Sequence, residues 1–138
     1  ASTEIDQAGM RVGVAQGSSS ESALGKAFKS AKLQTTPSLQ SAAALLVDKK
    51  LDAFATNKAI LFELLDSLPA GQFRVLDDRW GLEHLAIAVP KGREAGAPFV
   101  KAFVQKMLAN GQLHQIATAA GLRGMAQQTP SPSTGEKP

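Results

Sequence analysis

The chain has 138 residues, 43% of them hydrophobic and 20% charged, which is typical of one soluble domain large enough to bury a core. Its 15 basic residues are interleaved with 12 acidic ones, so the formal net charge of +3 forms no basic patch of the kind that binds nucleic acid. The absence of cysteine excludes disulfides and thiolate chemistry, and the longest apolar stretches, such as residues 42–47, are too short to cross a bilayer.

After a polar lead-in at residues 1–10, strand-like and helix-like segments alternate along the chain. Short apolar runs bounded by turn residues predict strands, and apolar side chains at intervals of three and four predict helices. In chain order we expect a strand at residues 11–15, a helix at 20–32, a strand at 33–36, a helix opened by Pro37 and Ser38, a strand at 51–56, a helix at 57–68, strands at 73–76 and 84–89, and two helices between Phe99 and Ala120.

The last two helices are each expected to carry an apolar face. Gly111 and Gly121 are placed as their C-terminal stops. After Met125 the sequence has three prolines and no large apolar side chain, so we expect residues 125–138 to be disordered. The apolar faces consist of Phe99, Val100, Phe103, Val104, Met107 and Leu108 in the first helix, and of Leu113, Ile116 and Ala120 in the second.

Strands that alternate with helices of about three turns are typical of an α/β fold. We therefore predict a parallel sheet with helices on its faces, in a three-layer α/β/α arrangement, followed by the C-terminal helices. Ligands of such sheets bind at the carboxyl ends of the strands.

The stretch VGVAQGSSSES changes from strand-like to polar at Gly17. Ser18 and Glu21 match an S-x-x-E capping box, in which a hydroxyl and a carboxylate satisfy free N–H groups of the first helical turn. The remaining N–H groups, the hydroxyls of Ser19 and Ser20 and the positive end of the helix dipole also form a receptor for a carboxylate or another oxyanion. The two interpretations are compatible. The Gly-x4-Gly-Lys-Ser/Thr pattern of a nucleotide-binding loop is absent.

The order of the motifs resembles that of a known family. VGVAQGSSSE is followed by a helix and LDAFATN, then by LEHLAIAVPKG, and finally by a helix pair that ends in NGQLHQIATAAGL. In this order and with this spacing, residues 10–124 resemble the bacterial extracellular solute-binding proteins of the polar amino-acid type. Those proteins are the ligand receptors of ABC importers and have a type II periplasmic-binding fold.

The resemblance implies two α/β lobes that close around a small ligand and are joined by two crossover segments. It assigns residues 11–82 to the second lobe, and residues 83–124 to the return crossover and the C-terminal helices. The N-terminal half of the first lobe has no counterpart in this sequence, so we expect a fragment with about half of a binding cleft. We also expect the apolar faces of the C-terminal helices to cause self-association of the fragment or to fold back onto the second lobe.

The resemblance also places candidate ligand-binding residues. Ser19 lies where the family has a Ser or Thr that hydrogen-bonds the ligand carboxylate. Ser18 and Ser20 belong to the same helix start, and Gln16 lies at the hinge. Asn57 lies where amino-acid binders usually have an Asp that pairs with the ligand ammonium. An amide brings no negative charge, so this departure argues against a simple α-amino acid as the ligand.

The resulting hypothesis is a non-enzymatic substrate-binding component of an ABC transporter, located in the periplasm or outside the cell. Its partners would be a small polar solute, anionic or amino-acid-like, the membrane permease and the absent lobe, with no nucleic acid and no cofactor. The alternative with the same fold is a ligand-sensing domain of a signalling protein or transcription regulator. An enzyme would need a general acid or base in the cleft, for which this chain offers Glu83 and His84.

Other polar side chains have a structural interpretation as the default. Asp52 starts a strand after a helix end. Trp80 is expected to be a partly buried packing residue, with an aromatic wall of the cleft as the alternative. Arg79 and Glu83 are expected to be solvated, although both lie close enough to the crossover to reach a ligand. The two histidines have no carboxylate or histidine at ligand spacing, so the sequence predicts no zinc site.

Overall fold

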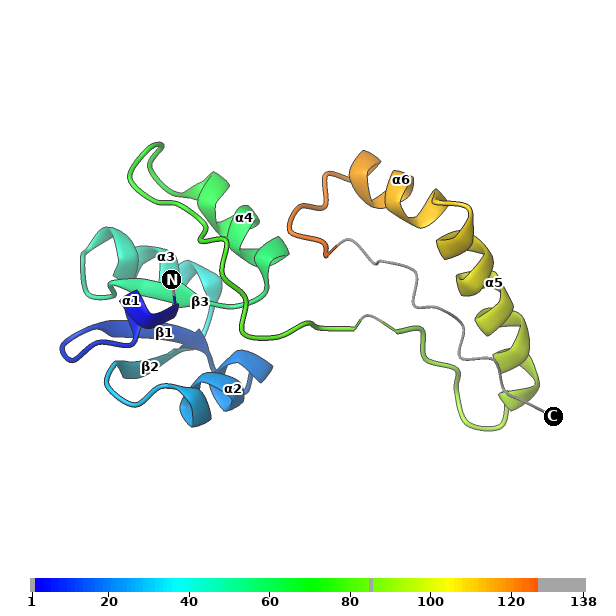
Figure 1. The fold of residues 1–138 in the computed structure, drawn as a ribbon, viewed down its shortest axis with the longest axis horizontal. Helices are drawn as coiled ribbons and strands as arrows, with labels where there is room; N and C mark the ends of the chain where they lie inside the picture. Colours follow the sequence, from blue (N-terminus) through cyan, green and yellow to red (C-terminus); the bar gives the residue numbers. More distant parts are fainter. Residues whose placement is uncertain (1, 85, 127–138) are drawn as a thin grey trace.

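The computed structural model describes residues 2–84 and 86–126, which form two parts (Figure 1). The N-terminal part is an α/β unit built around a small sheet, and the C-terminal part is a pair of helices. The connecting segment between them, residues 69–84 and 86–93, contains neither helix nor strand. The elements are α1 (Ser2–Ile5), β1 (Arg11–Ala15), α2 (Ser19–Ala27), β2 (Lys32–Thr36), α3 (Leu39–Val47), β3 (Ala53–Ala55), α4 (Lys58–Ser67), η1 (Glu94–Gly96), α5 (Ala97–Ala109) and α6 (Gln112–Ala119).

The sheet has three parallel strands in the order β2-β1-β3, which confirms the predicted α/β fold with a parallel sheet. Val12 of β1 pairs with Leu33 on one side and with Ala53 on the other. The chain therefore leaves β1 for one neighbour and then crosses back to the opposite neighbour. The carboxyl ends of β1 and β3 lie together where the strand order reverses, which is the position at which sheets of this kind bind ligands.

Side chains of the strands build a core on each face of the sheet. Val12 and Val14 are fully buried on one face, where they pack with Leu24 of α2. A second cluster contains Leu46 of α3 and Leu64 of α4, both less than a tenth exposed. Helix α2 thus covers one face of the sheet, and α3 and α4 cover the other.

Gly13 lies in the middle of β1 and points to the face that α3 and α4 cover. It pairs with Phe54 of β3, and paired residues of parallel strands share a face, opposite to that of Val12 and Val14. A Cβ atom at Gly13 would lie 2.5 Å from Leu51 Cδ1 and 2.9 Å from Phe54 Cδ2. The glycine therefore makes room for two large side chains of the second core.

Helix α2 is shorter than predicted, and Asp6 of the lead-in gives the reason. Phe28 ends α2 with an extended backbone, φ −76° and ψ 137°. The Asp6 carboxylate accepts hydrogen bonds of 2.8 to 3.1 Å from the backbone N–H groups of Lys29, Ser30 and Ala31. In a longer helix these N–H groups would donate to carbonyls of the preceding turn, so the carboxylate replaces the helical partners. The lead-in is therefore part of the packed α/β unit.

The strands predicted at residues 73–76 and 84–89 are wrong. Residue 85 lies outside the described residues, and the others belong to the connecting segment and pair with no strand. An extended backbone needs a neighbouring strand to satisfy its N–H and C=O groups, and the sheet of the described chain contains only β1, β2 and β3. Without such a neighbour, Ile87 keeps 58% of its surface exposed.

The two C-terminal helices, α5 and α6, form as predicted. Gly111, with φ 73°, lies between them, and Gly121, with φ 70°, follows α6, which confirms both as helix stops. Phe99 and Ile116 remain 76% and 56% exposed, so the apolar faces of this pair are not covered by the α/β unit. None of the helices in the described part of the chain is both long enough and apolar enough to cross a bilayer. Of the predicted tail, residues 127–138 lie outside the described residues.

Candidate functional site

The loop after β1 forms the start of α2. Gly17 has a positive φ of 72°, which glycine adopts without steric cost. Ser18 is the N-cap, and its Oγ accepts a hydrogen bond from the backbone N–H of Glu21 at 3.1 Å. The Glu21 carboxylate reaches back to the backbone N–H of Gly17 at 2.6 Å, one residue before its usual partner in a capping box. Because these residues cap the helix, the Ser19 hydroxyl is left for other contacts.

Asn57 holds the corresponding position after β3, as the N-cap of α4. Its Oδ1 accepts a hydrogen bond from the backbone N–H of Ile60 at 3.0 Å. This bond points Oδ1 of the Asn57 amide toward the helix. The Nδ2 group therefore points away from the helix and can donate to another partner. Nδ2 donates to Glu83 Oε2 at 3.3 Å. The sequence predicts Asn57 at the ligand site, and the structure adds its role as the N-cap of α4.

The Glu83 carboxylate bridges the two helix starts. Ser19 Oγ donates a hydrogen bond to Oε1, and Asn57 Nδ2 donates one to Oε2. The carboxylate lies at the N-terminal ends of α2 and α4, where the helix dipoles favour negative charge. The structure thus brings two of the predicted site residues together around an anionic group.

The other predicted site residues occupy different places. Ser18 is used by the cap of α2, and Ser20 is only 5% exposed, so its side chain belongs to the interior of the unit. Gln16 is exposed, and its backbone N–H donates to the carbonyl of Thr36 at 3.1 Å, which extends the pairing of β1 with β2. Ser19 and Asn57 are therefore the two predicted side chains that meet at one point.

Asp52 has the structural role that its sequence position indicated. Its carboxylate accepts hydrogen bonds from Nε and Nη2 of Arg11 at 2.9 and 2.8 Å, and from the Arg11 backbone N–H at 2.8 Å. These bonds lower the pKa of Asp52 from 3.8 to about 2. Arg11 Nη2 also donates to the carbonyl of Lys49 at 2.7 Å. This network lies at the amino ends of β1 and β3, the edge opposite the candidate site.

Glu83 is exposed, as expected, but the sequence did not indicate its hydrogen bonds to Ser19 and Asn57. The contact with Ser19 spans 64 positions, and no local pattern indicates it. Its neighbours in the connecting segment, Arg79 and His84, are exposed, and Trp80 keeps 37% of its surface exposed. Among the described residues, no three histidine, aspartate or glutamate side chains lie close enough together to hold a metal ion.

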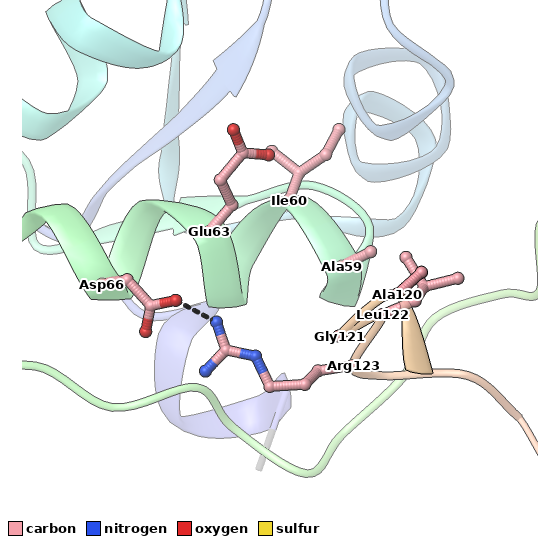
Figure 2. Close-up of a pocket in the computed structure, with 8 residues that line it drawn as sticks. All are labelled: Ala59, Ile60, Glu63, Asp66, Ala120, Gly121, Leu122 and Arg123. Carbon is pink, nitrogen blue, oxygen red and sulfur yellow. Dashed lines mark hydrogen bonds and ion pairs between the residues drawn. The ribbon is translucent and has the colours of Figure 1, made fainter. Parts of the chain in front are cut away.

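A separate hollow of about 290 Å³ lies between α4 and the residues that follow α6 (Figure 2). Arg123 lines it and forms an ion pair with Asp66 of α4. The guanidinium also donates to the carbonyl of Phe62 at 2.9 Å and lies 4.9 Å from the centroid of the Phe62 ring. Figure 2 shows Arg123 directed along α4 toward Asp66, with Glu63 pointing elsewhere. We infer that these contacts hold the residues after α6 against α4.

Comparison of the chain with protein-family models, with curated proteins and with solved structures finds no match. The family resemblance of the motifs therefore remains a prediction.

Proposed function

We propose that this chain is the substrate-binding component of an ABC transporter and that Ser19 and Asn57 hold the anionic group of a small polar solute. The observation that carries the proposal is the Glu83 carboxylate, to which both side chains donate hydrogen bonds. Because these two donors hold a carboxylate of the chain, a ligand with a carboxylate or a similar anionic group would suit this edge of the sheet. The order of the sequence motifs supports the class of protein.

The two donors favour negative over positive charge. Ser19 donates through a hydroxyl and Asn57 through an amide, and neither side chain carries a negative charge. The N-terminal ends of α2 and α4 add the positive partial charge of their dipoles. An ammonium group would find no charge-assisted partner in this pair of side chains. The ligand class is therefore an anionic solute, or the carboxylate end of a larger polar solute.

The proposal makes the α/β unit one lobe of an interlobe cleft. A second lobe would supply the opposite wall, and the membrane permease of the importer would be the protein partner, in the periplasm or outside the cell. Such a receptor binds its solute without converting it. The exposed apolar side chains of α5 and α6, among them Phe99 and Ile116, suit a buried contact with that second lobe.

Titration with succinate, followed by backbone amide chemical shifts, tests the proposal because it also detects weak binding. We expect shifts at residues 18–20 and 57–60, and none with methylammonium at the same ionic strength. Glu83 accepts a hydrogen bond from the same hydroxyl, so the test is made in the Glu83→Ala background. There, adding Ser19→Ala should weaken succinate binding about fivefold, or roughly 1 kcal/mol, the net value of one hydrogen bond. Adding Ser22→Ala instead, at an exposed position of the same helix, is the matched control and should leave the affinity of Glu83→Ala unchanged. Equal affinity with and without Ser19→Ala in this background would overturn the proposal.

A further inference from the structure

We infer that Glu83 is a tethered competitor for the anion site and that the connecting segment thereby regulates access to it. This inference rests on the proposed function, because it assigns a regulator to the same site. The contact joins parts of the chain that are distant in sequence: 64 positions separate Glu83 from Ser19, and 26 separate it from Asn57. It is therefore formed by the fold and not by local chain geometry.

Glu83 and a solute carboxylate cannot occupy the site together. The single hydroxyl hydrogen of Ser19 is donated to Glu83 Oε1, so it is not available to a second anion. Asn57 Nδ2 has a second hydrogen, but an anion held by it alone would lack the hydrogen bond from Ser19, and Asn57 Oδ1 is an acceptor that Ile60 already uses. Two carboxylates next to the same pair of donors would also repel each other. A solute anion must therefore displace Glu83.

The connecting segment can release Glu83 without unfolding the core. Residues 78–84 are exposed and contain neither helix nor strand. Closer to α4 the segment is anchored, because Phe73 packs against the second core and the carbonyl of Asp77 accepts a hydrogen bond from Lys58 Nζ at 2.8 Å. The Glu83 contact thus acts as a latch at the exposed end of an anchored segment, where local opening costs little.

A latch of this kind lowers the apparent affinity of the site by the fraction of molecules in which it is open. A latch that is closed in about nine molecules of ten reduces the apparent affinity about tenfold. Ligand binding to the wild type also releases the connecting segment around Glu83, so it changes a part of the chain that the ligand does not touch.

Acetate is a suitable probe, since it carries the carboxylate alone. It is titrated at constant ionic strength into the wild type, Glu83→Ala, Glu83→Gln and the control Asp77→Asn, with backbone amide shifts as the readout. Glu83→Ala should bind acetate about tenfold more tightly at residues 18–20 and 57–60. Glu83→Gln should be intermediate, because it loses the charge but keeps an acceptor oxygen. Asp77→Asn removes the same charge from an exposed side chain of the segment and should bind as the wild type does. In the wild type, acetate should also shift the amides next to Glu83.

The acetate affinities of the four proteins decide between the possible outcomes. Equal acetate affinity in the wild type and Glu83→Ala, with shifts at residues 18–20 in both, would overturn the latch and leave the anion site standing. A gain of the same size in Asp77→Asn would attribute the effect to net charge, which would also overturn the latch. No response at these amides in any of the four proteins would overturn the latch and the proposed function together.

Discussion

Ser19 Oγ and Asn57 Nδ2 donate hydrogen bonds to the two oxygens of one carboxylate, that of Glu83, from the starts of two different helices. The order of the strands explains why Ser19 and Asn57 lie close together. Because β1 and β3 are neighbours in the sheet, the helices that follow them begin at the same edge. The caps of both helices use other atoms, so the two donors face the carboxylate.

The first prediction concerns the charge of the site. Asn57→Asp keeps an N-cap of equal quality for α4, so the free energy of unfolding should change by less than about 0.5 kcal/mol. In the Glu83→Ala background, where no tethered carboxylate competes, the new carboxylate repels an anionic ligand, so succinate binding should weaken at least about tenfold while methylammonium binding appears. Amide chemical-shift titrations with both compounds measure this. Succinate affinity that is unchanged by Asn57→Asp in this background would show that Asn57 does not contact the anion.

The second prediction concerns the packing of β1. Gly13→Ala places a methyl group against Leu51 and Phe54 and should lower the free energy of unfolding by about 1–3 kcal/mol. Gly25→Ala is the matched control, because Gly25 lies in α2 with nothing within 4 Å of an added Cβ. It should raise the free energy of unfolding by about 0.5–1 kcal/mol through helix propensity. Urea denaturation measures both, and changes of the same sign would contradict the description of the core.

The third prediction concerns pH. Hydrogen bonds from Arg11 hold the pKa of Asp52 at about 2, below its ordinary value of 3.8. Because the pKa is lower in the folded state, the stabilisation is fully present above about pH 4 and is lost as the pH falls from 3.8 toward 2. Asp52→Asn should therefore cost about 1 kcal/mol near neutral pH, a value reduced by solvent screening, and almost nothing near pH 2. Urea denaturation of both proteins from pH 2 to 7 measures the difference, and a constant difference would contradict the assignment.

The fourth prediction concerns the C-terminal helices. Phe99 and Phe103 are 76% and 49% exposed on α5, so the chain on its own should self-associate with rising concentration. Phe103→Glu should weaken this association roughly tenfold or more, because it removes a large apolar side chain from the contact. Gln105→Glu, which adds the same charge at an exposed position of α5, should have little effect. Sedimentation equilibrium measures the association, and a monomer at all concentrations would exclude it.

Elements with strong local signals were predictable from the sequence. The breaks after β1 and β3 and the periodic apolar side chains of α3 and α4 are encoded within a few residues, and Ser38 caps α3 as its position indicated. The end of α2 was not predictable, because it depends on Asp6, which lies 23 positions before Lys29. The stretches 73–76 and 84–89 have strand-like composition, but a strand also needs a partner, which local sequence does not specify.

In the candidate site, too, features encoded within a few residues were predictable and those that depend on distant residues were not. Gly17 and the serines after it point to an anion-binding helix start, and the sequence also placed Asn57 at the end of a strand. The strand order that brings these two helix starts together is a property of the whole sheet. Glu83 could not be assigned, because it belongs to a segment whose path is fixed by distant contacts such as the bond from Lys58 to Asp77.

The central claim is that Ser19 and Asn57 bind the carboxylate of a solute, and a crystal structure of the chain with succinate tests it most directly. We predict one succinate carboxylate between Ser19 Oγ and Asn57 Nδ2, in the place that Glu83 now occupies, with Glu83 displaced into solvent. Succinate bound elsewhere, with the Glu83 carboxylate still held by both side chains, would contradict the claim.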